Sequence, residues 1–415
     1  MQEGSNPSNF RRRATRRSAA AEVPSGDTPR LIDDQQGFDE MVDRLIVSGR
    51  VALDTEFHRE GSYFPRVALL QFATTSERIL VDPLAVDIRG LGALLNSDVE
   101  IVMHACRQDL EILALECGAM PKHLIDTQIA ASHIGYSTPA LALLLERELR
   151  IKLGKEDRLT DWMRRPLSPS QLAYAIADVD HLLPLWDALR AKITKLGRLE
   201  WVSEAFDEVL QDASFGRDPE LAWVRIRELR HIKGTSLAVA QAIASWRERT
   251  AARLDVPVRT ILADMGIVGL AQSKPTSING VKAARGVEPR NLKGDLASEV
   301  LAVVAGALSN DPRPLPPGSG YDLSASLKPA VTLVTAWLTQ LAKDLELDPT
   351  TLGTRADVEA FLAHRPDARL AKGWRAKVAG DLIGSLVQGE AAVAFDQRHG
   401  LILIDRNVPQ TDVVT

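Results

Sequence analysis

The chain has 415 residues, which is too long for one compact core and predicts two to four domains. Hydrophobic residues make up 45% and charged residues 25%, so most of the chain can fold, and the formal net charge of −5 excludes a global attraction to nucleic acid. The two cysteines, Cys106 and Cys117, exclude a disulfide framework and indicate a reducing compartment.

The first residues carry no apolar stretch of the kind found in secretion signals, and charges interrupt every later apolar run before it could span a bilayer. We therefore expect a cytoplasmic protein that does not enter a membrane. Residues 1–28 are rich in Ser, Asn, Pro and Arg, and this composition predicts a disordered basic tail. Such a tail could attract RNA without specificity, or it could simply be solvated.

Residues 29–210 form the first predicted folded domain. It begins with a helix at 34–47, and its strand candidates are 50–57, 67–73, 79–82, 100–105 and 124–125. Turn-forming residues separate the first three strands, whereas helical segments separate the later ones and continue to about residue 205. Strands joined first by hairpins and then by helices predict an α/β domain, with a mixed sheet flanked by helices.

The remaining chain carries helical periodicity without a convincing strand. We expect a helical domain at 215–300 and a second, divergent helical domain at 323–408. The segment 301–322 between them is predicted to be a linker, because the prolines and glycines in its second half cannot sustain a helix or a strand.

Asp54 and Glu56 lie two residues apart in an apolar strand, so alternation places both side chains on one face of the sheet. Two adjacent carboxylates repel each other unless a cation lies between them, and hard divalent ions such as Mg²⁺ or Mn²⁺ prefer such oxygen ligands. A lone Asp-x-Glu pair is nevertheless more often a solvent-facing pair at the end of a strand.

Two further stretches carry acidic residues in a suitable order. Asp109 is expected on the first turns of the helix that follows strand 100–105, where carboxylates are common because they complement the helix dipole. Tyr174 and Asp178 are four apart on a predicted helix and therefore share one face. Each stretch alone has an ordinary structural explanation.

The three stretches together predict a metal-dependent nuclease. Four carboxylates that converge could hold two divalent ions, which can activate a water molecule and stabilise the leaving oxygen of a phosphodiester. The phenol of Tyr174 could orient that water or help to remove its proton. Three independent stretches in this order are much less probable by chance than any one of them.

At these residues the chain resembles the DEDD exonucleases, in the subclass whose last motif carries a tyrosine, and specifically the bacterial ribonuclease D type. The similarity covers roughly residues 30–205. The matching stretches are 53–57, 63–71, 81–84, 104–111, 124–128, 158–162, 165–167 and 174–180. Ala173 occupies the position where the histidine subclass carries its histidine, which supports the tyrosine assignment.

The resemblance implies a ribonuclease H-like α/β fold and a 3′→5′ exoribonuclease that releases nucleoside 5′-monophosphates. It implies that Asp54, Glu56 and Asp178 surround one metal ion, and that Asp54 bridges to a second ion held by Asp109, largely through water. Tyr174 is then expected to position the attacking water. The two ions are expected to be Mg²⁺ or Mn²⁺.

Four further side chains are candidates for contact with the substrate. His104 could touch the terminal nucleotide, although a histidine at the end of a strand is as often structural. Lys155, Arg158 and Arg165 could contact phosphates, or they could be ordinary solvated charges. Asp126 belongs to a matching motif, but we expect it to cap the helix that follows it.

Residues 217 to about 300 resemble the HRDC domain, a helical module shared by RecQ-type helicases and ribonuclease D. No phosphate-binding Gly-x-x-x-x-Gly-Lys-Ser/Thr loop occurs in the chain, which excludes a helicase. Residues 217–300 carry fourteen basic and nine acidic residues, a basic excess in an acidic chain that suits contact with phosphates, although it could also be incidental. Residues 324–406 resemble a second HRDC unit much more weakly.

The sequence therefore predicts a ribonuclease H-like exonuclease domain followed by two all-α HRDC-type domains. The predicted function is trimming of tRNA precursors and other structured RNA 3′ ends by a monomeric enzyme. A DNA-directed 3′→5′ exonuclease is an alternative, because the same metal site cuts either polymer and contacts to the 2′-hydroxyl cannot be located. A non-catalytic RNA-binding protein is a second alternative, which the intact carboxylate set disfavours.

Overall fold

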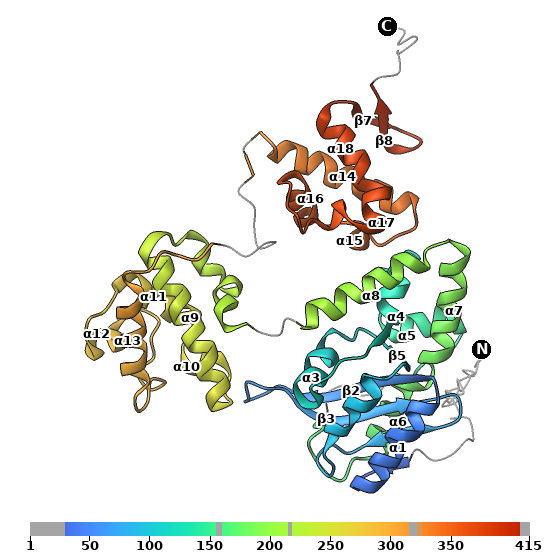
Figure 1. Ribbon diagram of the computed structural model, residues 1–415, viewed down its shortest axis with the longest axis horizontal. Helices are drawn as coiled ribbons and strands as arrows, with labels where there is room; N and C mark the ends of the chain where they lie inside the picture. Colours follow the sequence, from blue (N-terminus) through green and yellow to red (C-terminus); the bar gives the residue numbers. More distant parts are fainter. Residues whose placement is uncertain (1–29, 155–159, 215–217, 315–322, 325, 407–415) are drawn as a thin grey trace, which may run out of the picture.

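The computed structural model describes residues 30–154, 160–214, 218–314, 323–324 and 326–406. The chain forms an α/β domain, a middle helical unit within residues 218–314 and a C-terminal unit within residues 323–406 (Figure 1). The predicted basic tail at 1–28 lies outside the described residues. Among the described helices, none combines the length and the apolar character that crossing a membrane requires.

A six-stranded sheet with the order β1-β4-β3-β2-β5-β6 forms the centre of the α/β domain. Its strands are β1 (Arg30–Ile32), β2 (Arg50–His58), β3 (Arg66–Ala73), β4 (Arg78–Val81), β5 (Glu100–Met103) and β6 (His123–Asp126). The pairs β2–β3 and β3–β4 are antiparallel, whereas β1–β4, β2–β5 and β5–β6 are parallel. The predicted mixed sheet is therefore confirmed.

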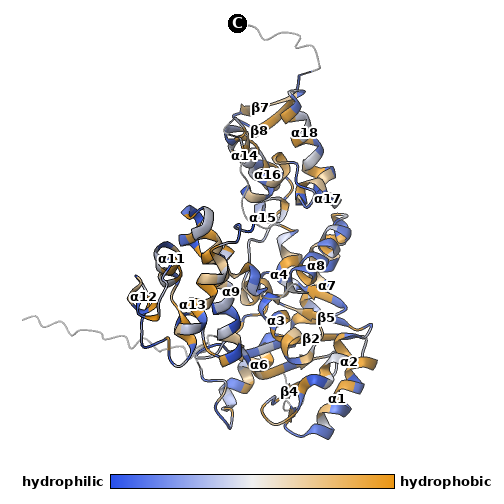
Figure 2. Ribbon diagram, turned by 60° about the vertical axis from the view of Figure 1, so that its left-hand side comes forward, coloured by the Kyte–Doolittle hydropathy of each residue, from blue (hydrophilic) through white to orange (hydrophobic). Residues whose placement is uncertain are grey.

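Helices cover both faces of this sheet. They are α1 (Gln35–Val47), η1 (Ile88–Leu91), α2 (Gly92–Leu95), α3 (Arg107–Cys117), α4 (Thr127–Ser132), α5 (Leu141–Leu144), η2 (Leu145–Leu149), α6 (Pro169–Asp180), α7 (Leu182–Lys195) and α8 (Leu199–Ser214). One core lies against α1, α2 and α3, and a second lies against α4, α7 and α8. Helices such as α1 show apolar and polar surfaces side by side (Figure 2), as expected when one side packs on a sheet.

The middle unit is built around the long helix α9. Its elements are η3 (Pro219–Arg225), η4 (Arg227–His231), α9 (Gly234–Leu254), α10 (Val258–Ile261), α11 (Asp264–Ser273), α12 (Ile278–Ala283) and α13 (Leu296–Ala307). The helical character expected from residue 217 begins as two short 3₁₀ helices. Helix α13 ends at Ala307, inside the 301–322 segment that was expected to be a linker.

The C-terminal unit is helical up to residue 388. Its helical elements are α14 (Lys328–Asp344), α15 (Pro349–Leu352), α16 (Arg355–Leu362), η5 (Arg369–Ala371), α17 (Gly373–Arg375), η6 (Ala376–Gly380) and α18 (Asp381–Gln388). The unit then ends in an antiparallel hairpin of β7 (Ala391–Asp396) and β8 (Gly400–Asp405), so the expectation that residues 391–405 are helical is wrong. The physical reason is a turn in which Asp396 accepts the backbone N–H groups of Arg398 and His399 and Gly400 adopts a φ of +77°.

The C-terminal unit packs directly on α8 and on the end of α4 of the α/β domain. The rings of Trp201 and Trp374 stack with centroids 4.4 Å apart. The Arg375 guanidinium, which is almost fully buried, donates to Glu208 Oε1 at 2.7 Å, and the backbone N–H of Asp348 donates to Ser132 O at 2.9 Å. These buried contacts make the C-terminal unit a fixed neighbour of the α/β domain.

Candidate active site

Strand β2 and helix α6 bring three of the predicted carboxylates together. Asp54 and Glu56 lie on one face of β2, and buried Thr55 lies between them in the sequence. Asp178 comes from the last turns of α6, which packs against β2, β3 and β4. One oxygen atom from each of these carboxylates lies within 4.8 Å of the other two, and all three side chains are half-buried. We call these three residues the acidic cluster.

Asp109 stands beside the acidic cluster. It lies in the first turn of α3, as predicted, and is buried. Its Oδ1 accepts a short hydrogen bond from the hydroxyl of Thr55. The residue between the two β2 carboxylates thus anchors the fourth one, a role that the sequence analysis missed. The spacing Asp-Thr-Glu contains the hydroxyl, but nothing in it indicates a partner on another helix.

Asp126 fixes the turn that leads into α3. It caps α4 by accepting the N–H groups of Gln128 and Ile129, as predicted, and it also accepts those of Ala105 at 3.2 Å and Cys106 at 2.8 Å. Ala105 has a φ of +58°, an unusual conformation for a residue with a side chain. The hydrogen bonds to Asp126 therefore stabilise the unusual backbone of this turn. They also fix the position at which the helix that carries Asp109 begins.

Burial and the nearby negative charges raise the pKa of three carboxylates of the site, those of Asp54, Glu56 and Asp109. Burial is the largest cause that raises the pKa of Asp54, and the charges of Asp109, Asp178 and Glu56 raise it further. Burial, followed by Asp178 and Asp109, raises the pKa of Glu56 to about 8. Burial also raises the pKa of Asp109 to about 6, against the hydrogen bond from Thr55. A cation bound close to these carboxylates would lower their pKa values, because it favours the ionised form.

Tyr174 lies one turn before Asp178 on α6, as the spacing predicted. The helix begins with a capping box, in which Ser168 and Gln171 exchange hydrogen bonds. The centroids of the Tyr174 and Trp162 rings lie 6.0 Å apart, and Tyr174 packs partly buried against the hydrophobic cluster that contains Trp162 and the strand residues Ala68 and Leu69. This packing fixes the ring on the same helix face as Asp178.

The residues that were predicted to contact the substrate lie in different surroundings. His104 follows β5, and its Nδ1 lies 2.8 Å from the Thr127 hydroxyl. Arg165 makes a two-pronged ion pair with Asp82 at 2.6 Å and also donates to Trp162 O and Ala68 O, both at 2.7 Å. A phosphate contact by Arg165 would have to replace some of these bonds. Lys155 and Arg158 lie outside the described residues.

The donor atoms of the site fit a hard divalent cation. The acidic cluster offers only carboxylate oxygen atoms, which Mg²⁺ and Mn²⁺ prefer over nitrogen or sulfur. Its three mutually repelling side chains are held half-buried by two rigid elements, an arrangement that is unfavourable without a compensating charge. The arrangement therefore suits metal-assisted hydrolysis.

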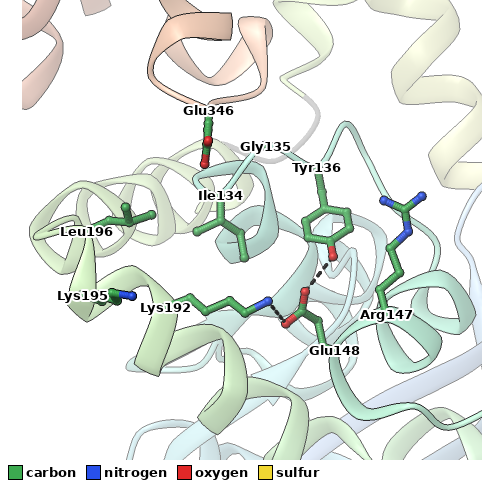
Figure 3. Close-up of a pocket in the computed structure, with 9 residues that line it drawn as sticks. All are labelled: Ile134, Gly135, Tyr136, Arg147, Glu148, Lys192, Lys195, Leu196 and Glu346. Carbon is green, nitrogen blue, oxygen red and sulfur yellow. Dashed lines mark hydrogen bonds and ion pairs between the residues drawn. The ribbon is translucent and has the colours of Figure 1, made fainter.

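A separate pocket of about 430 Å³ lies where the α/β domain meets the C-terminal unit (Figure 3). Glu148 lies inside it, accepts a hydrogen bond from the Tyr136 hydroxyl at 2.6 Å and pairs with Lys192 at 2.6 Å. Glu346 of the C-terminal unit closes one side. The carboxylate of Glu148 is thus compensated within the pocket, and none of the carboxylates of the acidic cluster lines it.

Comparisons with known proteins agree with this geometry. Residues 29–194 match the family model described as 3′-5′ exonuclease, and residues 236–304 match the HRDC domain. The chain is 35% identical to ribonuclease D of Acidiphilium cryptum over 388 residues, covering 91% of this chain and 97% of the relative. It is 34% identical to ribonuclease D of Gluconacetobacter diazotrophicus over 374 residues, covering 89% and 95%.

A solved structure shows the same architecture. Escherichia coli RNase D, described as an exoribonuclease involved in structured RNA processing, superposes with a TM-score of 0.78 at 26% identity, covering 88% of this chain and 99% of that one. The fold and the matched segments define a hydrolase of the 3′→5′ exonuclease class with an HRDC domain. The chain belongs to the ribonuclease D family of exoribonucleases.

The family assignment confirms the predicted exonuclease fold, the predicted enzyme class and the first HRDC domain. From here the middle unit is called the HRDC domain. The match reported for the HRDC model ends at residue 304, so an HRDC origin of the C-terminal unit stays a prediction.

Proposed function

We propose that the acidic cluster is the centre of a metal-dependent active site that hydrolyses RNA from its 3′ end and releases nucleoside 5′-monophosphates. The observation that carries this proposal is the convergence of Asp54, Glu56 and Asp178 within 4.8 Å, with Asp109 beside them. The same four residues occupy the motif positions by which the sequence resembles the DEDD exonucleases.

Asp54, Glu56 and Asp178 would hold one divalent ion, and Asp54 with Asp109 would hold a second. Bound Mg²⁺ or Mn²⁺ ions would supply Lewis-acid stabilisation of the phosphodiester under attack. Thr55 keeps the Asp109 carboxylate oriented and favours its ionised form. The Tyr174 hydroxyl would orient the attacking water and accept its hydrogen bond, because the ring is fixed one turn from Asp178.

The proposed substrates are tRNA precursors and other structured RNAs with a single-stranded 3′ end. Support comes from the family, from the structured-RNA role stated for the Escherichia coli protein, and from the basic excess of residues 217–300. We also propose that His104 contacts the terminal nucleotide from its place after β5. One chain is expected to suffice, since all four carboxylates come from a single chain.

The test compares a 3′-extended tRNA with a single-stranded DNA of the same 3′ sequence, each with Mg²⁺ and with Mn²⁺. We expect 5′-mononucleotides to appear one at a time from the RNA, and we expect Asp54→Ala to abolish their release while its circular dichroism spectrum stays unchanged. The exposed Glu60→Ala is the matched control, with activity like that of the unmodified chain. Faster digestion of the DNA would favour the DNA-directed alternative, and full activity of Asp54→Ala would overturn the metal site.

A further inference from the structure

The loop between β2 and β3, residues 59–65, links the exonuclease domain to the HRDC domain. It leaves β2 directly after the segment that carries Asp54 and Glu56, and it extends to the end of α9 (Figure 1). Tyr63 from this loop packs against the core of the HRDC domain. The loop therefore belongs to one domain by its chain path and to the other by its packing.

Asp255 of the HRDC domain receives the backbone of this loop. Its Oδ1 accepts the N–H groups of Tyr63 at 3.0 Å and Phe64 at 3.1 Å. Asp255 terminates α9 with a φ of +47°, a left-handed conformation that Asp tolerates better than most residues. The backbone conformation that ends the helix thus also places the Asp255 carboxylate within hydrogen-bond distance of two consecutive N–H groups of the exonuclease domain.

Glu248 makes a second contact to the same loop. Its carboxylate is almost fully buried, and Oε1 accepts the Tyr63 hydroxyl at 2.9 Å and the Arg225 guanidinium at 3.0 Å. A buried carboxylate needs such donors, and one of the two comes from the exonuclease domain. Removal of the Tyr63 hydroxyl would leave Glu248 with the donor from its own domain.

The loop is also tied to the helix that carries Asp109. Arg59, its first residue, donates to Glu111 on α3 at 3.0 Å, and its guanidinium lies 5.1 Å from the centre of the Phe57 ring. The loop is thus held at its base by β2 and α3, which carry three of the four active-site carboxylates. The contacts between the tip of the loop and the HRDC domain therefore hold that domain in a defined position relative to those carboxylates.

We propose that Asp255 and Glu248 are positioning residues, which hold the HRDC domain against the β2–β3 loop and so determine where the body of a structured RNA lies relative to the active site. This inference rests on the proposed function. If the contact were lost, only a fraction of the molecules would hold the active site and the HRDC domain in the arrangement that binds a structured RNA. The apparent affinity for that RNA would fall by the same fraction. A short single-stranded RNA, bound at the active site alone, would not sense the difference.

The test measures kcat and KM on a short single-stranded RNA and on a hairpin RNA with the same 3′ overhang. Asp255→Gly removes the carboxylate but keeps a residue that accepts the left-handed backbone. We expect it to raise KM about fivefold to tenfold for the hairpin RNA, with kcat unchanged and both constants unchanged for the short RNA. Tyr63→Phe, which removes only the hydroxyl, should raise the same KM about threefold.

Two controls separate the contact from general damage. Asp255→Asn retains an oxygen acceptor and should restore KM to within about twofold. Ser62→Ala removes a hydrogen bond inside the loop, from Ser62 Oγ to Phe64 O, without touching the HRDC domain, and should have no effect. An unchanged KM for the hairpin RNA in Asp255→Gly, or an equal rise for both RNAs, would overturn the proposal.

Affinity for the hairpin RNA, measured in EDTA for the same variants, tests the contact independently of catalysis. Asp255→Gly should weaken this affinity about fivefold to tenfold, like the change in KM, and should do so even if the chain cut no RNA. Equal affinity of Asp255→Gly and the unmodified chain would overturn the inference. Failure of the proposed function would instead appear as absent digestion of both RNAs by the unmodified chain.

Discussion

Metal affinity should depend steeply on pH, because Glu56 retains its proton well above the usual pKa of a glutamate when no cation is present. The pKa of Glu56 is raised to about 8 by burial and by the neighbouring Asp178 and Asp109. At pH 6 roughly 99% of the metal-free protein would carry this proton, against about half at pH 8. A divalent ion must displace it, so apparent affinity should fall by a factor of about fifty between pH 8 and pH 6.

A lower pH should stabilise the metal-free fold, although it weakens metal binding. The pKa of Glu56 rises from 4.5 to about 8, so the folded state binds this proton more tightly than the unfolded chain does. The resulting stabilisation is complete below pH 4.5 and is lost as pH rises to 8. Mn²⁺ should therefore raise the unfolding temperature more at pH 8 than at pH 6.

Isothermal titration calorimetry with Mn²⁺ tests this directly, at pH 6, 7 and 8 and in buffers with different heats of ionisation. We expect Mn²⁺ binding at pH 6 to release close to one proton per chain from Glu56 and about half a proton from Asp109, with additional release if Asp54 also holds a proton. Glu56→Gln should bind Mn²⁺ more weakly with a flatter pH dependence, while the exposed Glu60→Gln should behave like the unmodified chain. Equal affinity at pH 6 and pH 8, without proton release, would refute the reasoning.

Three further predictions follow from particular contacts. Thr55→Val deletes the hydroxyl that favours ionised Asp109 and should lower the rate of nucleotide release at pH 6 about tenfold, with partial recovery at pH 8; an unshifted pH–rate profile would contradict this. Trp374→Ala should reduce the free energy of unfolding in urea by about 3–5 kcal/mol, and Trp374→Phe by clearly less, because the ring is buried against α8; equal losses would exclude this packing. Burial lowers the pKa of His133 to about 4, so stability should fall by about 3 kcal/mol as pH drops from 6.5 to 4, and His133→Gln should flatten that slope.

The central sheet and the carboxylates could be predicted because they depend on local patterns. Alternation in β2 placed Asp54 and Glu56 on one face, and helical spacing placed Tyr174 and Asp178 on another element. The family resemblance added the order in which these elements meet. Local periodicity and motif order are properties that a sequence carries directly.

Contacts between distant segments could not be predicted in the same way. The hydrogen bond from Thr55 to Asp109 joins residues 54 positions apart, and the Trp201–Trp374 stack joins two units. Strands β7 and β8 were missed because Ala- and Leu-rich segments suit a helix as well as a strand, and the hairpin turn at Asp396 decides between them. Such outcomes depend on tertiary packing, which residue patterns do not specify.

The central claim is that the acidic cluster binds the metal ions and that RNA is cut there. The most direct measurement determines Mn²⁺ binding by equilibrium dialysis at pH 8, and nucleotide release by the same samples, for the unmodified chain and for Asp178→Asn. We predict about two Mn²⁺ ions per chain for the unmodified protein, and for Asp178→Asn the loss of at least one ion together with a rate lower by at least about a hundredfold. An Asp178→Asn protein that keeps both its ions and its rate would contradict the claim.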